Sequence, residues 1–498
     1  MKVLFFANHY KTIVFHKIAA KLIQAGHRVY WISPSHEWAE WLVRNGVERH
    51  TLLDLTDYGE EWVAKSKQEL SEEDRSFIAA HEGQDLLLSN MILMDRGLVN
   101  KKPSYARAFL AVCGKRIKQF LLDHGIQTVF SERTWATELL TVKLCEKLAI
   151  ANFHPQVIRI PDGRFSFFNT YTEKNFEWIR KPSSEDIRQA EQFLDYFLEA
   201  SPKPRYFHLN NIVPRIRARW PIAFFQRLIR ERRYRYRYDS ALPTTFELVG
   251  HKFNELFNTW SIRMKDPFMM PHPETRPTRP YVLYAIHKQP EASIDVLGGA
   301  CSNQLDIIRA MARSTPSTHD LYVKEHSNNI GNNSMRFYKQ LLSIPGVKLI
   351  SPFADSHSLF KRADLVVTVS GTIAYEAGLF GVPAVSVASM FFSPLLVDGN
   401  FNPYSDSIAE LLRNQRPSLP SHADKVSFIA RLLANSFEGT MSCPIEDHTC
   451  VKHDNIDLLA RGFFTLLDVI EQKQPSAETR PLPLVDHSLA APPLRVTV

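Results

Sequence analysis

The sequence has 498 residues, of which 44% are hydrophobic and 23% are charged. This balance is typical of globular proteins and excludes disordered and collagen-like chains, while the length predicts two or three domains. The net charge of +7 comes from 60 basic and 53 acidic residues that are interspersed along the chain. We therefore expect no nucleic acid among the partners.

Five cysteines without a C-x-x-C pair argue against both a disulfide framework and a zinc knuckle. The apolar run at residues 3–6 is too short for a secretory signal, and no small-residue cleavage site follows it. Residues 377–397 carry no charge over a length that could cross a bilayer, but glycines and prolines divide them into a helix end, a buried strand and a loop. We therefore expect a cytoplasmic protein without a membrane span.

The first part of the chain alternates between apolar runs and segments with helical spacing. Strands are expected at 2–7, 28–33 and 128–131, and helices at 15–25, 105–124 and 136–148. This rhythm predicts a doubly wound, Rossmann-like domain over residues 1–165, on the acceptor side of the molecule.

The remaining chain divides into three parts. In residues 166–279 the strand-like runs disappear and arginines and aromatics accumulate, which predicts a helical insertion or connector. Strand and helix alternation resumes over 280–471, and 472–498 is a proline-rich segment expected to be disordered. The predicted fold class is α/β, with two doubly wound domains facing a cleft that is lined by the carboxyl ends of parallel strands.

One apolar strand leads directly into Ser370, Gly371 and Thr372 at the start of a helix. The amides and the dipole of a helix start favour an anion such as phosphate, and glycine allows that anion to approach closely. Glu376 lies one turn further on the same face, where its carboxylate can accept hydrogen bonds from ribose or sugar hydroxyls. The alternative is that Ser370 and Thr372 only cap the helix and that Glu376 is a surface acid.

Two further polar segments follow predicted strands of the same domain. His287, Gln289 and Glu291 offer donors and acceptors for a charged sugar or a pyrophosphate, unless they form an ordinary proline turn. Lys324 and His326 end another strand. Either side chain can neutralise a phosphate or protonate a leaving oxygen, but a histidine at a strand end can also be structural.

Together these segments resemble the capsule polysaccharide biosynthesis glycosyltransferases, whose relatives include Kdo transferases. The likeness is the order Gln-Pro-Glu-x-Ser, Val-Lys-x-His, Ser-Gly-Thr, Glu-Ala and Gly-x-Pro over about residues 280 to 400, with His-Ser in place of the family's usual His-Pro. The resemblance implies a GT-B fold and a CMP- or UDP-linked sugar donor bound by the C-terminal domain, with no metal and no cofactor. The implied donor-site residues are Gln289, Glu291, Lys324, His326, Ser370, Gly371, Thr372 and Glu376.

The resemblance also implies that the acceptor is a capsular polysaccharide or its glycolipid precursor. In the first domain, Glu132 follows a predicted strand and is the candidate base or acceptor-positioning carboxylate. The alternative is an acid that only favours a helix N-terminus. His9 and Lys11, after the first strand, are further candidates.

Arginines alternate with aromatic residues over 215–237, a pattern that suits either an anionic membrane surface or nucleic acid. The apolar side chains among the arginines favour the membrane. The alternative is a helix packed on the core with a solvated basic face. The candidate membrane-contact residues are Arg217, Arg219, Trp220, Phe224, Phe225, Arg227 and Arg230.

Two other functions fit the same sequence. A nucleotide-sugar epimerase can use the same two-domain fold, and it would need no acceptor. A non-catalytic scaffold of a polysaccharide assembly complex could also retain the fold without turnover.

Overall fold

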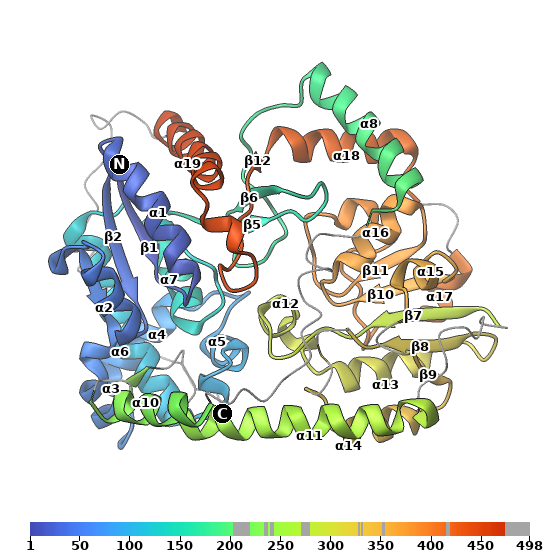
Figure 1. Ribbon diagram of the computed structural model, residues 1–498, viewed down its shortest axis with the longest axis horizontal. Helices are drawn as coiled ribbons and strands as arrows, with labels where there is room; N and C mark the ends of the chain where they lie inside the picture. The colour runs from blue at the N-terminus through green and yellow to red at the C-terminus, as the bar shows by residue number, and fades with distance from the viewer. Residues whose placement is uncertain are drawn as a thin grey trace, which may run out of the picture.

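The computed structural model describes residues 1–202, 220–233, 238–239, 244–269, 279–326, 329, 332–350, 354–414 and 419–473. Two β-sheets lie side by side in it, each with helices on both faces (Figure 1). The predicted α/β class with two doubly wound domains is confirmed.

The first sheet has the strand order β12-β6-β5-β4-β1-β2-β3. Its strands are β1 (Lys2–Phe6), β2 (Arg28–Ser33), β3 (Leu52–Asp54), β4 (Thr128–Phe130), β5 (Ala151–Val157), β6 (Arg164–Phe168) and β12 (Phe437–Glu438). The strands from β3 to β5 run parallel, and β6 and β12 are added antiparallel. The strand order reverses between β1 and β4, which is where open α/β sheets bind ligands.

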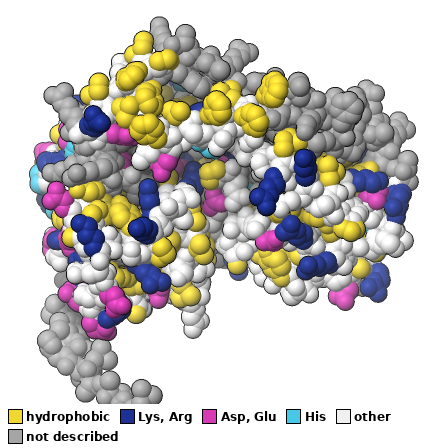
Figure 2. Space-filling model, turned by 90° about the horizontal axis from the view of Figure 1, so that it is seen from below, with side chains coloured by type: hydrophobic (Ala, Val, Ile, Leu, Met, Phe, Trp, Pro, Cys, Tyr) yellow, Lys and Arg dark blue, Asp and Glu magenta, His cyan; other side chains and the backbone are white. Residues whose placement is uncertain are grey.

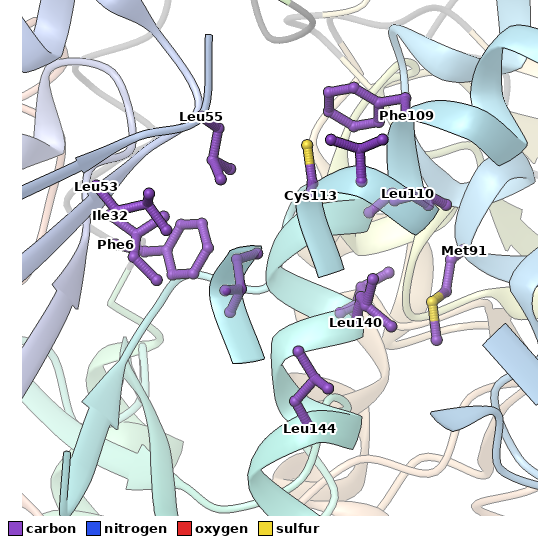
Figure 3. Close-up of a cluster of buried hydrophobic side chains, with 14 of the residues drawn as sticks. Phe6, Ile32, Leu53, Leu55, Met91, Phe109, Leu110, Cys113, Leu140 and Leu144 are labelled. Atoms are coloured by element: carbon purple, nitrogen blue, oxygen red, sulfur yellow. The ribbon is translucent and has the colours of Figure 1, made fainter. Parts of the chain in front are cut away.

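Alternate side chains of β1 enter different cores because successive residues of a strand point to opposite faces. Leu4 and Phe6 pack on the face covered by α6 and α7, where Figure 3 shows Phe6 and Ile32 opposite Leu140. Val3 and Phe5 pack on the face covered by α1 and α19. The helices of this domain are α1 (Lys11–Gln24), α2 (His36–Arg44), α3 (Gly59–Lys65), α4 (Glu72–His81), α5 (Leu88–Met94), α6 (Pro103–His124), α7 (Ala136–Leu148) and α19 (His453–Lys473).

The second sheet has the order β11-β10-β7-β8-β9, and all its strands are parallel. The strands are β7 (Tyr281–Ala285), β8 (Asp320–Lys324), β9 (Val347–Ile350), β10 (Leu365–Thr368) and β11 (Ala384–Ser386). Its helices are α12 (Ala292–Asp295), α13 (Gln304–Ser314), α14 (Met335–Leu342), α15 (Ser356–Phe360), α16 (Thr372–Phe380), α17 (Ile408–Asn414) and α18 (His422–Ala434). The order reverses between β7 and β10, so this sheet also has a switch point at the carboxyl ends of its strands.

The packing differs from the predicted domain boundaries in two places. Helix α19 lies in the segment assigned to the second domain, yet it packs against α1, and β12 pairs with β6 of the first sheet. Phe463 of α19 contacts the rings of Phe5 and Phe130 there. Helix α8 (Ser184–Ala200) lies in the segment assigned to the connector, yet it packs on α18 and α16 of the second domain. Helical spacing indicates that each helix has an apolar face but not which sheet that face covers.

Two helices of the predicted connector, α10 (Trp220–Arg233) and α11 (Thr245–Met269), run along the lower edge of the molecule in Figure 1. Residues 377–397 fold as the end of α16, the buried strand β11 and a 3-10 turn at Ser393–Leu395. Among the described helices, none combines the length and the apolar character that crossing a membrane requires.

Candidate functional site

At the carboxyl end of β7, the ring of His287 is held against the loop that follows β10. Gln304 fixes the backbone of His287: its Oε1 accepts the amide N–H at 2.7 Å, and its Nε2 donates to the carbonyl at 3.0 Å. The Nε2 atom of His287 accepts from the Ser370 N–H at 3.3 Å and lies 2.9 Å from the Thr368 hydroxyl. Nε2 therefore carries no proton, and burial lowers the pKa of this imidazole to about 4. His287 is a neutral acceptor that shapes the loop.

This arrangement requires a glycine at position 371. A Cβ atom on Gly371 would lie 2.6 Å from the Oγ1 atom of Thr368 and 3.3 Å from Cε1 of His287. The amide N–H of Gly371 donates to Thr368 Oγ1 at 3.1 Å. The loop therefore passes over the imidazole closely enough to exclude any side chain.

Helix α16 begins directly after this glycine. Gly371 is its N-cap residue, so no side chain of that residue satisfies the first amides. The Ser370 hydroxyl donates instead to the carbonyl of Ser293 at 2.5 Å and does not cap the helix. Gly371 and Thr372 are half-buried, so the positive end of the helix dipole reaches the surface of the domain. An anion can bind at such a helix start.

Glu376 lies one turn further along α16, and its carboxylate is engaged. Its Oε2 atom lies 3.0 Å from Nε2 of His357 on α15, and both side chains are largely buried. The expected hydrogen bonds from Glu376 to ribose or sugar hydroxyls stay a prediction. The contact with His357 is one of distance only, because His357 Nε2 has no hydrogen-bond partner among the described residues.

The carboxyl end of β8 is anchored by a buried acid. Glu325 accepts hydrogen bonds from the side-chain amides of Asn329 at 3.0 Å and Asn333 at 2.9 Å, and from the hydroxyl of Tyr338. Burial raises the pKa of this carboxyl to about 7. Glu325 therefore holds the start and the end of the loop after β8 together.

The two predicted site residues beside this acid differ in exposure. Lys324 is buried, and burial lowers the pKa of its ammonium to about 8. His326 is accessible to solvent, yet desolvation by the surrounding protein lowers its pKa, while Glu291 opposes the shift. A side chain that is accessible and still desolvated is expected on the wall of a cleft.

The side chain of Gln289 is used to hold its own loop. Its Nε2 atom donates to Asp295 Oδ1 at 2.7 Å, and its Oε1 accepts from Gln304 at 3.4 Å. Glu291 is exposed and accepts a hydrogen bond from the Ser293 hydroxyl at 2.9 Å. Of Gln289 and Glu291, only Glu291 therefore presents its polar group to solvent.

On the side of the first domain, Glu132 and Lys11 form an ion pair in which both side chains are largely buried. The backbone around Glu132 is organised by Glu138, which is fully buried and accepts from the amides of Glu132 at 3.1 Å, Thr134 at 2.6 Å and Trp135 at 3.1 Å. Burial raises the pKa of Glu138 to about 7. Glu138 thus fixes the loop after β4, and Lys11 fixes the carboxylate that this loop carries.

Glu446 connects the two domains electrostatically. Its side chain is accessible to solvent, yet desolvation raises the pKa of its carboxyl group. Lys288 and Lys11 oppose this rise, and Glu291 and Glu132 add to it. Charged groups that follow β1 and β4 therefore act on the same carboxylate as groups that follow β7. The switch points of the two sheets face one cleft.

A cavity of about 620 Å³ opens between the domains, where Gln289 and Pro290 of the loop after β7 face residues of the first domain. Its amide side chains are suited to hydrogen-bonding sugar hydroxyls, and Arg96 adds a cation that acts on Asp295 across the domain boundary. It is lined by Asn90, Leu93, Met94, Arg96, Val99, Asn100, Gln289, Pro290, Asp295, Gly299, Ala300, Ser302 and Asn333. Within the described ranges, His, Cys, Asp and Glu side chains form no group that could hold a metal ion.

Several residues of the cleft were missed by sequence reasoning. Arg159, after β5, acts on both His287 and His326, and it opposes the rise that burial causes in the pKa of Glu173. Glu446 and Arg96 reach the cleft from loops that follow no predicted strand. A single sequence carries no local signal for such residues, because only packing brings them to the site.

Two of the predicted membrane contacts, Arg217 and Arg219, lie outside the described residues. A third, Trp220, is described only as the first residue of α10. Phe225 is exposed, while Phe224 is half-buried and contacts the ring of Phe246. Two arginines of the set face the protein: Arg230 pairs with Glu37 at 3.0 Å, and Arg227 is half-buried.

No known protein-family model matches the sequence, and no curated protein sequence matches it. Solved structures with partial overlap include KpsC, a beta Kdo 2,7 transferase of Thermosulfurimonas dismutans, with a TM-score of 0.32 and 11% identity over 71% of this chain and 89% of that chain. They also include UDP-GlcNAc 2-epimerase from Neisseria meningitidis bound to UDP-GlcNAc, with a TM-score of 0.28 and 12% identity over 87% of this chain and 98% of that one.

A third is the glycosyltransferase VinC in complex with dTDP, with a TM-score of 0.25 and 13% identity over 95% of this chain and 100% of that chain. With TM-scores this low, the fold assignment rests on the strand order of the chain itself.

Proposed function

We propose that this protein transfers a sugar from a CMP- or UDP-linked donor to a saccharide acceptor, either a capsular polysaccharide or its lipid-linked precursor. The observation that supports the proposal is that charged groups after β1 and β4 of the first sheet and after β7 of the second act on one carboxylate, that of Glu446. The α16 start and Lys324 belong to the second domain, and the Lys11–Glu132 pair belongs to the first.

The donor phosphates would bind at the start of α16. The amides after Gly371 and the helix dipole stabilise the negative charge that grows on the leaving phosphate as its bond to the sugar breaks. Lys324 would supply a cation at the end of β8, which β7 separates from β10 in the sheet. His326, on the accessible wall of the cleft, would donate a hydrogen bond or a proton to the leaving oxygen.

Glu132 would accept the proton of the acceptor hydroxyl that attacks the sugar. Lys11 holds this carboxylate, and Glu138 holds the loop that carries it. The acceptor saccharide would occupy the cavity of about 620 Å³ between the domains, where Asn90, Asn100 and Asn333 offer donors and acceptors for its hydroxyls. Holding both reactants in this geometry would be the main source of the rate.

The test is calorimetric titration of the protein with UDP, CMP and their sugar conjugates, followed by product analysis with and without a saccharide acceptor. The proposal expects nucleotide binding that weakens at least tenfold in Lys324→Gln, and a product only when the acceptor is present. Conversion of the donor sugar without an acceptor would identify an epimerase. Binding without any turnover would identify a scaffold.

A further inference from the structure

The outer faces of α10 and α11 carry a continuous set of bulky apolar side chains, which we name the apolar band. Figure 2 shows hydrophobic side chains gathered over these two helices on the lower face of the molecule. The band comprises Ile222, Phe225 and Ile229 of α10 and Phe246, Val249, Phe253, Phe257 and Trp260 of α11, with exposed fractions from 48% to 70%. Single exposed apolar residues are common on protein surfaces, but eight large apolar side chains gathered on two adjacent helices mark an interaction site.

The spacing of the band follows the helix period. Its members on α11 recur every three or four residues from 246 to 260, which places them on one stripe of the helix. The inward side of the same helix is mixed, because Thr245 and Thr259 are buried there and Leu248 and Leu256 are half-buried. Thr245 also donates to Glu231 of α10. The side chains of the band are therefore an apolar stripe that this packing leaves outward.

We propose that the apolar band inserts into the interface of an anionic membrane. The charge of the surrounding sequence favours this partner, because residues 215–237, which include the α10 part of the band, contain nine arginines and one acidic residue. Among the arginines whose side chains are described, Arg232 and Arg230 are exposed, the latter beside Glu37, and Arg227 is half-buried. The acids of α11 whose side chains are described have cations nearby: the exposed Glu247 lies 3.8 Å from Lys101, and the half-buried Glu255 pairs with Lys252 at 2.5 Å. Basic residues beside an apolar helix face favour binding at the level of anionic headgroups.

The apolar band goes beyond the predicted basic segment, because five of its eight side chains lie on α11. Docking through the apolar band would also set the orientation of the cleft relative to the membrane. The interdomain cavity includes Val99 and Asn100, and Lys101, the next residue, pairs with Glu247 at the start of α11. Leu93 and Val99, which line the cavity, are themselves exposed. If the proposed function holds, a docked protein would receive its acceptor from the bilayer, as a lipid-linked saccharide.

Flotation with vesicles tests the docking. Vesicles of phosphatidylcholine alone are compared with vesicles that also contain phosphatidylglycerol, using the full chain and the variant Phe253→Ser, Phe257→Ser, Trp260→Ser. The matched control, Ile23→Ser with Leu122→Ser, removes exposed apolar side chains from α1 and α6. We expect the wild type and the control to float with the anionic vesicles, and the band variant to lose binding by about tenfold or more. High salt should weaken wild-type binding without abolishing it.

Three results would overturn the proposal. They are a wild type that does not float, a band variant that floats as well as the control, and a wild-type dimer that becomes a monomer in the band variant during sedimentation. The last result would show that a second copy covers the band. Titration with UDP or CMP in the absence of vesicles separates this proposal from the proposed function, because band variants should bind nucleotide like the wild type. Flotation retained in a protein that binds no nucleotide would leave the docking intact and remove only the transferase.

Discussion

The Nε2 atom of His287 accepts the amide N–H of Ser370 at a distance of 3.3 Å. This contact joins the end of β7 to the loop after β10, across the switch point of the second sheet. Because the same nitrogen also lies 2.9 Å from the Thr368 hydroxyl, the imidazole must stay neutral, and its lowered pKa of about 4 keeps it neutral at physiological pH. His287 is therefore a residue that shapes the loop of the proposed anion site and not an acid of the proposed reaction.

Substituting Gly371 by alanine should disrupt this site. The new Cβ would lie 2.6 Å from Thr368 Oγ1 and would displace the loop, at a cost of about 1–3 kcal/mol in unfolding free energy. We expect UDP or CMP affinity to fall at least tenfold in calorimetric titrations. Gly250→Ala is the matched control, since no atom lies within 4 Å of its added Cβ. Unchanged affinity in Gly371→Ala would show that the anion does not bind at the start of α16.

Nucleotide affinity should depend on pH through Lys324. Burial lowers the pKa of this ammonium to about 8, so raising the pH through 8 removes the positive charge, and affinity for the phosphates should fall above that pH. Lys324→Gln should bind weakly at pH 7 and show no such decrease between pH 7 and pH 9. Titrations of both proteins over this range give the measurement. A wild type whose affinity is constant from pH 7 to pH 9 would contradict the role of Lys324.

Glu132→Gln should reduce turnover more than donor binding. Removing a general base typically costs about 10²–10⁴ in rate, while the proposed phosphate site on the other domain is untouched. We therefore expect a lower kcat with an unchanged KM for the donor, measured by steady-state kinetics. Asp457→Asn is the control, because it breaks the surface pair with Lys21 at 2.7 Å. A variant with normal kcat would leave Glu132 a structural partner of Lys11.

Phe463→Ala should destabilise the first domain although it lies near the end of the chain. The side chain is fully buried, and its ring lies 4.7 Å from that of Phe130 and 4.9 Å from that of Phe167. Truncation of such a phenylalanine costs about 3–5 kcal/mol, measured as a shift of the urea unfolding curve. The neighbouring Phe464 is only half-buried, so Phe464→Ala should cost clearly less. Equal shifts for the two variants would mean that α19 does not stabilise the first sheet.

Local patterns predicted much of the architecture. The apolar runs expected at 2–7, 28–33 and 128–131 correspond to β1, β2 and β4, and the glycine expected to open a helix is the N-cap of α16. These features depend on residues that are neighbours in sequence, where side-chain period and backbone preference act directly. The expected use of Gln289 as a donor ligand shows the limit of this reasoning, because its amide is engaged by Asp295 and Gln304.

The sequence by itself determined the class of fold and the residues that follow its strands. Only the tertiary structure decided that α19 returns to the first sheet, that Glu446 lies within electrostatic reach of both Lys11 and Lys288, and that α11 turns its apolar stripe outward. The physical reason is that periodicity encodes the presence of an apolar face, whereas its burial and its partners depend on segments hundreds of residues away. Those long-range contacts exist only once the two sheets have packed.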